Sequence, residues 1–153
     1  MKVEVLKANK NDMKTILLLQ KDCYISEAEL YNDYSIPPLQ QDLKSLETEF
    51  DNSIILKCVI NGEIIGSVRG YKADDTSYIG RLIVKKDFQN KGYGRLLVES
   101  IESMFKDCKR FELFTGHKSH KNLYLYNKLG YKEFKKKVLN KNLTIIYLEK
   151  IKQ

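Results

Sequence analysis

A short segment with two glycines is the part of the sequence best suited to bind an anion. It reads Val-Lys-Lys-Asp-Phe-Gln-Asn-Lys-Gly-Tyr-Gly-Arg over residues 84–95, between a predicted apolar strand and a predicted helix. The first N–H groups of a helix have no partner within it and carry partial positive charge, which suits a phosphate. Gly92 and Gly94 let backbone approach a ligand, and Lys91 and Arg95 add positive charge.

Two familiar phosphate motifs are absent from this segment. It does not end in the Gly-Lys-Ser/Thr of a Walker loop, and it lacks the three glycines of the dinucleotide fingerprint. A plainer interpretation also fits, in which glycine only allows a tight turn from strand to helix. On the glycines alone, the two interpretations stay open.

The spacing Gln89-x-x-Gly92-x-Gly94, after Leu-Ile-Val at residues 82–84, resembles the acyl-CoA loop of the GNAT superfamily of N-acyltransferases. A second segment, Asn-Leu-Tyr-Leu-Tyr-Asn-Lys-Leu-Gly-Tyr at residues 122–131, resembles the Leu-Tyr-x-Lys-x-Gly-Phe/Tyr segment of that family. The order and separation of the two segments also fit, and the resemblance covers essentially the whole chain.

The resemblance implies a single N-acetyltransferase domain over residues 1–153 with acetyl-CoA as co-substrate. The implied reaction is direct transfer of an acetyl group to a primary amine of a small molecule or peptide. A module that binds or senses acyl-CoA without turnover is the alternative. The identity of the amine, and any preference for another acyl group, are left open by the sequence.

The resemblance also places the cofactor residue by residue. Leu82 and Val84 would offer backbone groups to the pantetheine arm, with the Ile83 side chain on the opposite face. The residues expected to cradle the pyrophosphate are Gln89, Asn90, Lys91, Gly92, Tyr93, Gly94 and Arg95. The chain departs from the family at Ser119, where many relatives carry asparagine. A hydroxyl can still donate or accept, so Ser119 or Asn122 is expected to take over that contact.

Tyr126 matches the tyrosine that, in many relatives, lies near the thioester sulfur and protonates the departing thiolate. Its plainer role is that of a core aromatic beside Leu125 and Leu129. Amine acetylation also needs a route for the amine proton. A strand N–H near Val84 is expected to polarise the thioester carbonyl. The resemblance implies no covalent enzyme intermediate.

The general base is poorly specified by the sequence. The predicted cofactor strand, residues 78–84, contains no carboxylate. Glu112 on the next strand is one candidate, and His117 is another because histidine titrates near neutral pH. Histidines in a polar stretch are also commonly ordinary loop residues.

Four residues are candidates for the acceptor pocket: Tyr31, Tyr34, Arg69 and Tyr71. An arginine on a strand suggests an acidic group on the substrate. A structural ion pair explains Arg69 equally well.

The net charge of +7 admits a nucleic-acid partner, an acidic partner or an anionic cofactor. The lysines are spread along the chain, and the run at residues 135–137 is typical of a solvated face, so we expect no nucleic-acid partner. Cys23, Cys58 and Cys108 form no Cys-x-x-Cys pair, which gives no indication of a metal site. No apolar run is long enough for a membrane span and no signal-peptide core is present, which favours a cytoplasmic protein. A homodimer through the terminal strands is compatible with the sequence.

The predicted elements give an α+β fold, with a mixed, mostly antiparallel central sheet flanked by helices. Strands are expected from residue 3 and over residues 54–60, 64–71, 78–84, 111–115, 131–138 and 143–149. Helices are expected after residue 12, continuing brokenly toward residue 31, and over residues 39–50, after the glycine pair, and over 121–129. Pro37 and Pro38 are expected to stop any helix. The loop at residues 84–95 then joins a central strand to a helix with one apolar stripe.

Overall fold

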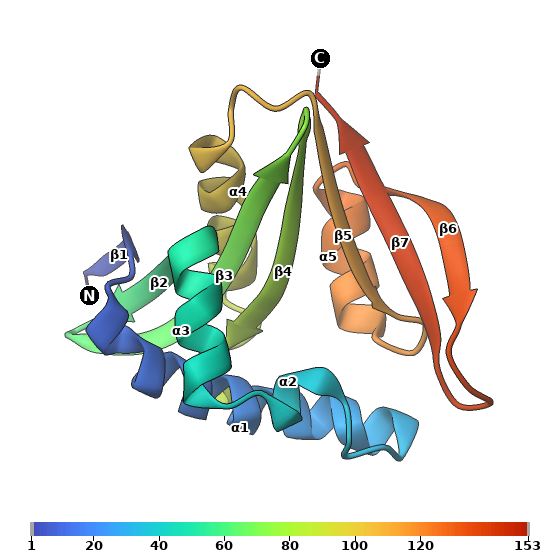
Figure 1. The fold of residues 1–153 in the computed structure, drawn as a ribbon, viewed down its shortest axis with the longest axis horizontal. Helices are drawn as coiled ribbons and strands as arrows, with labels where there is room; N and C mark the ends of the chain where they lie inside the picture. The colour runs from blue at the N-terminus through green and yellow to red at the C-terminus, as the bar shows by residue number, and fades with distance from the viewer. Residues whose placement is uncertain (1, 153) are drawn as a thin grey trace.

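A seven-stranded sheet runs through the protein, as shown by a computed structural model that describes residues 2–152 (Figure 1). The strands are β1 (Val3–Lys7), β2 (Ile54–Ile60), β3 (Glu63–Ala73), β4 (Thr76–Val84), β5 (Arg110–Gly116), β6 (Lys132–Val138) and β7 (Thr144–Ile151). Their order in the sheet is β1-β2-β3-β4-β5-β7-β6. Every neighbouring pair is antiparallel except β4 and β5. The predicted mixed, mostly antiparallel sheet is therefore confirmed.

Helices cover both faces of this sheet (Figure 1). They are α1 (Met13–Tyr31), α2 (Pro37–Gln40), α3 (Leu43–Asn52), α4 (Tyr93–Met104) and α5 (His120–Lys128), with 3-10 turns η1 (Lys10–Asp12) and η2 (Lys86–Phe88). α1 and α3 share one apolar cluster that includes Met13 and Leu46. α4 and α5 share a larger cluster on the other face, which includes Leu97. Cys58 and Cys108 are buried in this second cluster.

The helices before β2 differ from the prediction in two places. α1 is continuous as far as Tyr31 rather than broken. Pro37 and Pro38 do not simply stop the chain but form the start of α2, because a first-turn N–H is unpaired in any helix and proline lacks one. The single helix expected over residues 39–50 is therefore two helices. α3 begins after Asp42, whose carboxylate accepts a backbone N–H of the first turn at 2.8 Å.

β4 and β5 stay paired over only part of their length. The parallel ladder joins Thr76, Ser77 and Tyr78 to residues 110–112, and beyond Tyr78 the strands separate (Figure 1). A β-bulge shifts the register between β3 and β4 at this point, with Arg81 at a left-handed φ of 51°. The backbone groups of residues 79–84 that face β5 therefore have no partner among the described strands. We call this part of the sheet the β4–β5 opening.

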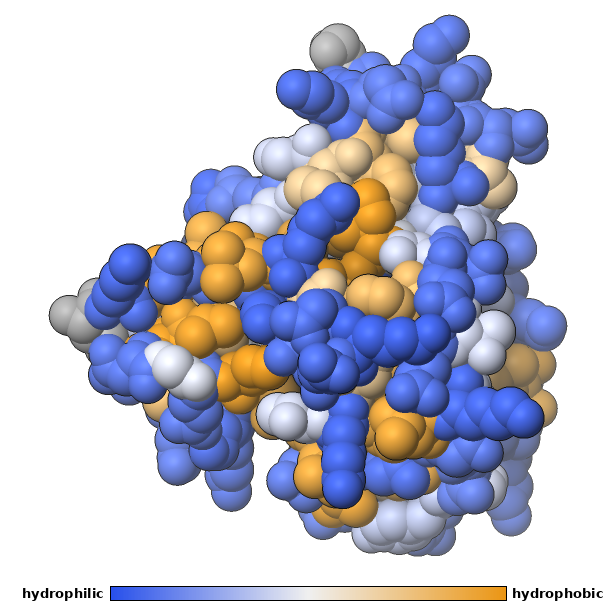
Figure 2. Space-filling view, turned by 60° about the vertical axis from the view of Figure 1, so that its left-hand side comes forward, coloured by the Kyte–Doolittle hydropathy of each residue, from blue (hydrophilic) through white to orange (hydrophobic). Residues whose placement is uncertain are grey.

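The surface is largely hydrophilic, with apolar patches interrupted by charged side chains on the face shown in Figure 2. β6 is an edge strand that is exposed along its whole length and carries Lys135, Lys136 and Lys137. Charged side chains on an edge strand oppose pairing with other chains. Of the helices within residues 2–152, none is both long enough and apolar enough to cross a membrane.

Candidate functional site

The loop after β4 leads directly into α4. The Gln89 side chain donates from Nε2 to the Val84 carbonyl at 2.9 Å, which fixes the turn at its start. Gly92 has a φ of 89°, a conformation that L side chains rarely adopt, so glycine there satisfies backbone geometry. Gly94 has a different role, because a Cβ there would lie 3.4 Å from Leu125 of α5. The tight turn thus explains why residue 92 is glycine. It provides no hydrogen-bond partner for the first N–H groups of α4.

The start of α4 combines free N–H groups with nearby positive charge. No side chain of the described residues caps this helix, so the first-turn N–H groups remain available to a ligand. Lys91 lies with its Nζ 6.0 Å from the centre of the Phe88 ring. Arg95 forms an exposed ion pair of 3.5 Å with Glu99, which solvent screens. These features suit an anion such as a pyrophosphate.

The second half of α1 spans the open end of the sheet. The Cys23 thiol donates to the Val84 carbonyl of β4 at 3.5 Å. One turn further on, Glu27 accepts a hydrogen bond from Ser119, in the loop after β5, at 2.6 Å. Burial raises the pKa of the Cys23 thiol to about 11, so it stays protonated and donates. α1 therefore contacts β4 and the loop that follows β5, on either side of the β4–β5 opening.

Tyr31 is fixed by a chain of hydrogen bonds rather than left free to line a pocket. Its hydroxyl oxygen accepts the Lys118 N–H at 2.9 Å and lies 2.8 Å from Ser119 Oγ. Because Ser119 donates to Glu27, the Tyr31 hydroxyl donates to Ser119. Both Tyr31 and Ser119 are buried. The predicted Ser119 contact with the cofactor thus competes with an internal contact, and Asn122 likewise donates to Thr115 at 3.2 Å.

Tyr126 is a buried residue of α5, with its ring centre 6.1 Å from that of Tyr131. α5 lies beside the start of α4, since a Cβ at Gly94 would lie 3.4 Å from Leu125, and its Asn122 donates to Thr115 of β5. These contacts place Tyr126 on the helix that packs against both the start of α4 and β5. Burial, reinforced by Tyr24 and then Glu27, raises the pKa of the Tyr126 phenol far above its usual value. The group is protonated at neutral pH.

The two predicted bases are both engaged by other groups. Glu112 lies on β5 opposite Tyr78, where the strands are still paired, and forms an ion pair of 2.8 Å with Arg110. His117 accepts the Thr144 N–H on Nδ1 at 3.0 Å. The same Nδ1 lies 3.3 Å from the Thr144 carbonyl oxygen, so the backbone of Thr144 occupies this ring nitrogen.

Two of the predicted acceptor-pocket tyrosines lie apart from each other. Tyr34 follows α1 and is exposed. Tyr71, near the end of β3, stacks on Tyr78 with ring centres 5.3 Å apart. That position is beside the paired end of β4 and β5, away from the opening. The structure does not bring the four predicted pocket residues together.

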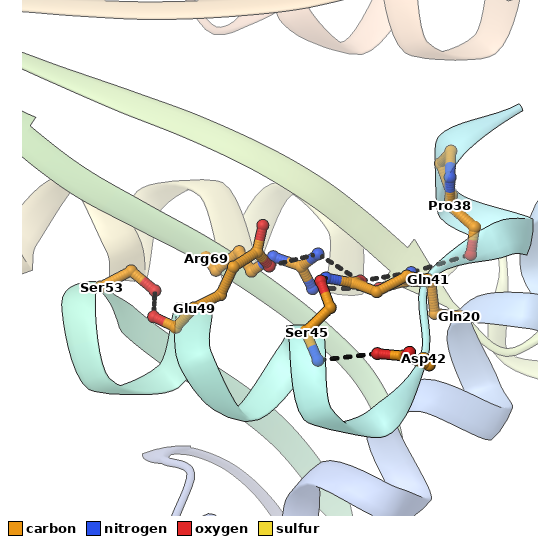
Figure 3. A network of polar contacts seen from close by, with 8 residues as sticks. All are labelled: Gln20, Pro38, Gln41, Asp42, Ser45, Glu49, Ser53 and Arg69. Atoms are coloured by element: carbon orange, nitrogen blue, oxygen red, sulfur yellow. Dashed lines mark hydrogen bonds and ion pairs between the residues drawn. The ribbon is translucent and has the colours of Figure 1, made fainter.

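Arg69 is held by an internal network (Figure 3). Its guanidinium donates to Gln20 at 3.0 Å and to Gln41 at 3.1 Å. Its Nη2 also lies 2.8 Å from Oε2 of Glu49, an ion pair without the alignment of a hydrogen bond. Burial lowers the pKa of Arg69 to about 10, with Glu49 opposing the shift, so the group stays charged at neutral pH. Of the two roles considered for Arg69, the structural ion pair is the one observed.

A cavity of about 380 Å³ lies beside this network. It is lined by Pro37, Gln40, Gln41, Asp42, Ser45, Glu49 and Arg81. These residues come from α2, α3, the turn between them and the bulge of β4. Arg81 was not predicted from the sequence, and neither were Tyr24 and Glu27. The signal that could have found the last two was their spacing with Tyr31 at i, i+3 and i+7, which places all three on one face of a helix.

Known proteins share this fold and part of the sequence. The sequence model of the acetyltransferase (GNAT) family matches residues 14–131. The PaiA N-acetyltransferase of Thermoplasma acidophilum, solved with coenzyme A, is 17% identical with a TM-score of 0.82 and 99% of each chain covered. The putative acetyltransferase yncA of Salmonella typhimurium, solved with acetyl-CoA, is 14% identical with a TM-score of 0.79, covering 100% of this chain and 95% of its own.

A curated relative is the UPF0157 protein YqkA of Bacillus subtilis, which is 28% identical over 120 residues, or 78% of this chain. The match covers 34% of that protein, so this chain spans about a third of its relative's length. The two solved structures establish the fold, and the family match spans most of the chain, including the loop after β4 and the Tyr126 segment. The chain belongs to the GNAT family of acetyltransferases.

Proposed function

We propose that this chain transfers an acetyl group from acetyl-CoA directly to a primary amine of a small molecule or peptide. The observation that carries the proposal is the arrangement at the carboxyl end of β4. The uncapped start of α4 and the β4–β5 opening both lie there, and α5, which carries Tyr126, packs beside the start of α4. This arrangement supports a path along which acetyl-CoA would meet anion-binding N–H groups, strand backbone and a protonated phenol.

The residues fit acetyl-CoA in three parts. The first-turn N–H groups of α4, with Lys91 and Arg95, would hold the pyrophosphate. The backbone groups of residues 79–83 that face the opening would hydrogen-bond the amides of the pantetheine arm, as a neighbouring strand does. Acetyl-CoA would supply the activated thioester. Tyr126 would give its proton to the sulfur as the C–S bond breaks and the new C–N bond forms.

Glu27 is the better-placed base in this proposal, ahead of Glu112 and His117. It lies on the part of α1 that crosses the open end of the sheet and is only partly buried. Its Oε1 accepts from Ser119, which orients the carboxylate and leaves the second oxygen to receive the amine proton. Glu112 is paired with Arg110, and Nδ1 of His117 accepts from Thr144.

Two measurements test the proposal. Calorimetry with acetyl-CoA should show saturable binding, and its absence at millimolar ligand would exclude the cofactor assignment. A thiol-release assay over polyamines, aminoglycosides, amino acids and peptide N-termini should then identify an acceptor. Tight binding without release of thiol on any amine would favour the non-catalytic acyl-CoA-binding module.

A further inference from the structure

The cavity beside β4 contains an arginine whose charge is balanced by no ion pair within residues 2–152. Arg81 lines this cavity, and its Nε is buried without a hydrogen-bond partner in the same part of the chain. A buried donor without a partner is costly and rare in folded proteins. The other arginines each pair with a glutamate: Arg69 with Glu49, Arg95 with Glu99, and Arg110 with Glu112 and Glu149.

The two carboxylates that line the cavity are already engaged. Glu49 lies 2.8 Å from Nη2 of Arg69, and Asp42 accepts the first-turn N–H of α3 from Ser45 at 2.8 Å. Figure 3 shows both carboxylates directed at these partners. Arg69 in turn is occupied by Gln20 and Gln41 as well as by Glu49. Among the described residues, Arg81 is therefore the free cation of this cavity.

The cavity also lies close to the reaction path. Arg81 is in the bulge of β4, next to the strand residues that face the opening. α1 lies beside this part of the strand, because Cys23 donates to the Val84 carbonyl, three residues beyond Arg81, at 3.5 Å. On the other side of the opening, Glu27 of the same helix accepts from Ser119 at 2.6 Å. An acceptor seated in the cavity would present one end to Arg81 and the other toward the opening that α1 crosses.

We propose that Arg81 selects acceptors in which the amine is joined to a carboxylate or a similar anionic group. This inference rests on the proposed acetyl transfer and names its substrate class. A guanidinium presents a planar pair of donors that matches a carboxylate, and its Nε belongs to that pair. The cavity volume of about 380 Å³ is in the range of small-molecule sites. A polyamine would place positive charge against Arg81 and is disfavoured.

The test uses pairs of acceptors in which the single carboxylate is replaced by a neutral amide: β-alanine with β-alaninamide, and γ-aminobutyrate with its amide. For the native protein we expect kcat/KM to be about 10- to 100-fold higher for each carboxylate, which is what one charged hydrogen-bond pair contributes. Arg81→Gln should remove this preference, and Arg81→Lys should restore part of it. Lys44→Gln removes an exposed positive charge from α3 and should leave the preference unchanged.

Binding supplies a second readout that does not need turnover. With coenzyme A present, calorimetry should show tighter binding of γ-aminobutyrate than of its amide to the native protein and no difference for Arg81→Gln. Equal affinity for γ-aminobutyrate and its amide, or a preference for spermidine, would overturn the inference. Failure to bind acetyl-CoA would instead count against the proposed transfer, and Arg81→Gln should bind acetyl-CoA like the native protein. A thermal melt of each variant distinguishes loss of selectivity from loss of folding.

Discussion

The hydroxyl of Tyr31 lies 2.8 Å from that of Ser119, although 88 residues separate them in the chain. This contact joins the end of α1 to the loop that follows β5. It is allowed by Gly116, where a Cβ would collide with the Tyr31 hydroxyl. Together with the contact from Cys23 to Val84, it makes α1 a bridge across the open end of the sheet. The opening between β4 and β5 is therefore held at a fixed width by a helix rather than by strand pairing.

Replacing Tyr126 with phenylalanine should lower kcat of acetyl transfer by about 10²-fold, the usual contribution of a positioned acid. The Tyr126 hydroxyl takes part in none of the side-chain hydrogen bonds within residues 2–152. The melting temperature and the Kd of acetyl-CoA should therefore change little. Steady-state kinetics and calorimetry on the same preparation check both parts. An unchanged kcat would remove Tyr126 from the chemistry.

The raised pKa of Tyr126 predicts how the rate of acetyl transfer depends on pH above neutrality. An acid acts in its protonated form, which persists up to its pKa, and burial moves that pKa upward. The rate should therefore not fall between about pH 7 and pH 10, where an ordinary tyrosine begins to ionise. A pH–rate profile at saturating acetyl-CoA measures this. A fall in rate centred below pH 10, and missing from Tyr126→Phe, would contradict the assignment.

Replacing Glu27 with glutamine should lower kcat by about 10²-fold at neutral pH and less at higher pH, where more of the amine is already neutral. The amide oxygen can still accept from Ser119, so the bridge and the melting temperature should be preserved. Glu29→Gln is the matched control, since Glu29 is exposed on the same helix. A similar loss of rate in both variants would indicate a general charge effect instead of a base.

Alanine at Gly92 should weaken acetyl-CoA binding, whereas alanine at Gly62 should not. Both glycines have left-handed φ values, 89° and 81°, and a Cβ added at either position would meet no atom of residues 2–152 within 4 Å. Each change should therefore lower the free energy of unfolding by about 1 kcal/mol through backbone strain alone. Only Gly92 lies at the expected pyrophosphate site. Urea unfolding and calorimetry separate the two effects, and equal Kd values would argue against that site.

Much of the secondary structure follows from local sequence signals. Asn61 and Gly62 form the turn between β2 and β3, and the other predicted strands lie within two residues of their observed bounds. The segments around residues 84–95 and 122–131 also indicate the family. The sequence does not show which side chains face the opening, because that depends on where β4 and β5 separate. Arg81 lines the cavity only because of the bulge, and Glu27 meets Ser119 only because α1 crosses the open end of the sheet, and neither arrangement follows from a local sequence pattern.

The role of Gly116 gives a direct test of the bridge. Gly116→Ala would place a methyl group against the Tyr31 ring, and we expect the free energy of unfolding to fall by about 1 to 3 kcal/mol, as for other overpacked sites. The acetylation rate should fall as well, because displacing Tyr31 also disturbs Ser119 and Glu27. In a protein that already carries Tyr31→Leu, Gly116→Ala should lower the free energy of unfolding much less, because the phenol ring that the new methyl group would contact is absent. Urea unfolding of the four proteins gives the coupling energy. Additive effects would show that the two side chains do not depend on each other, and that α1 is held in place by other contacts.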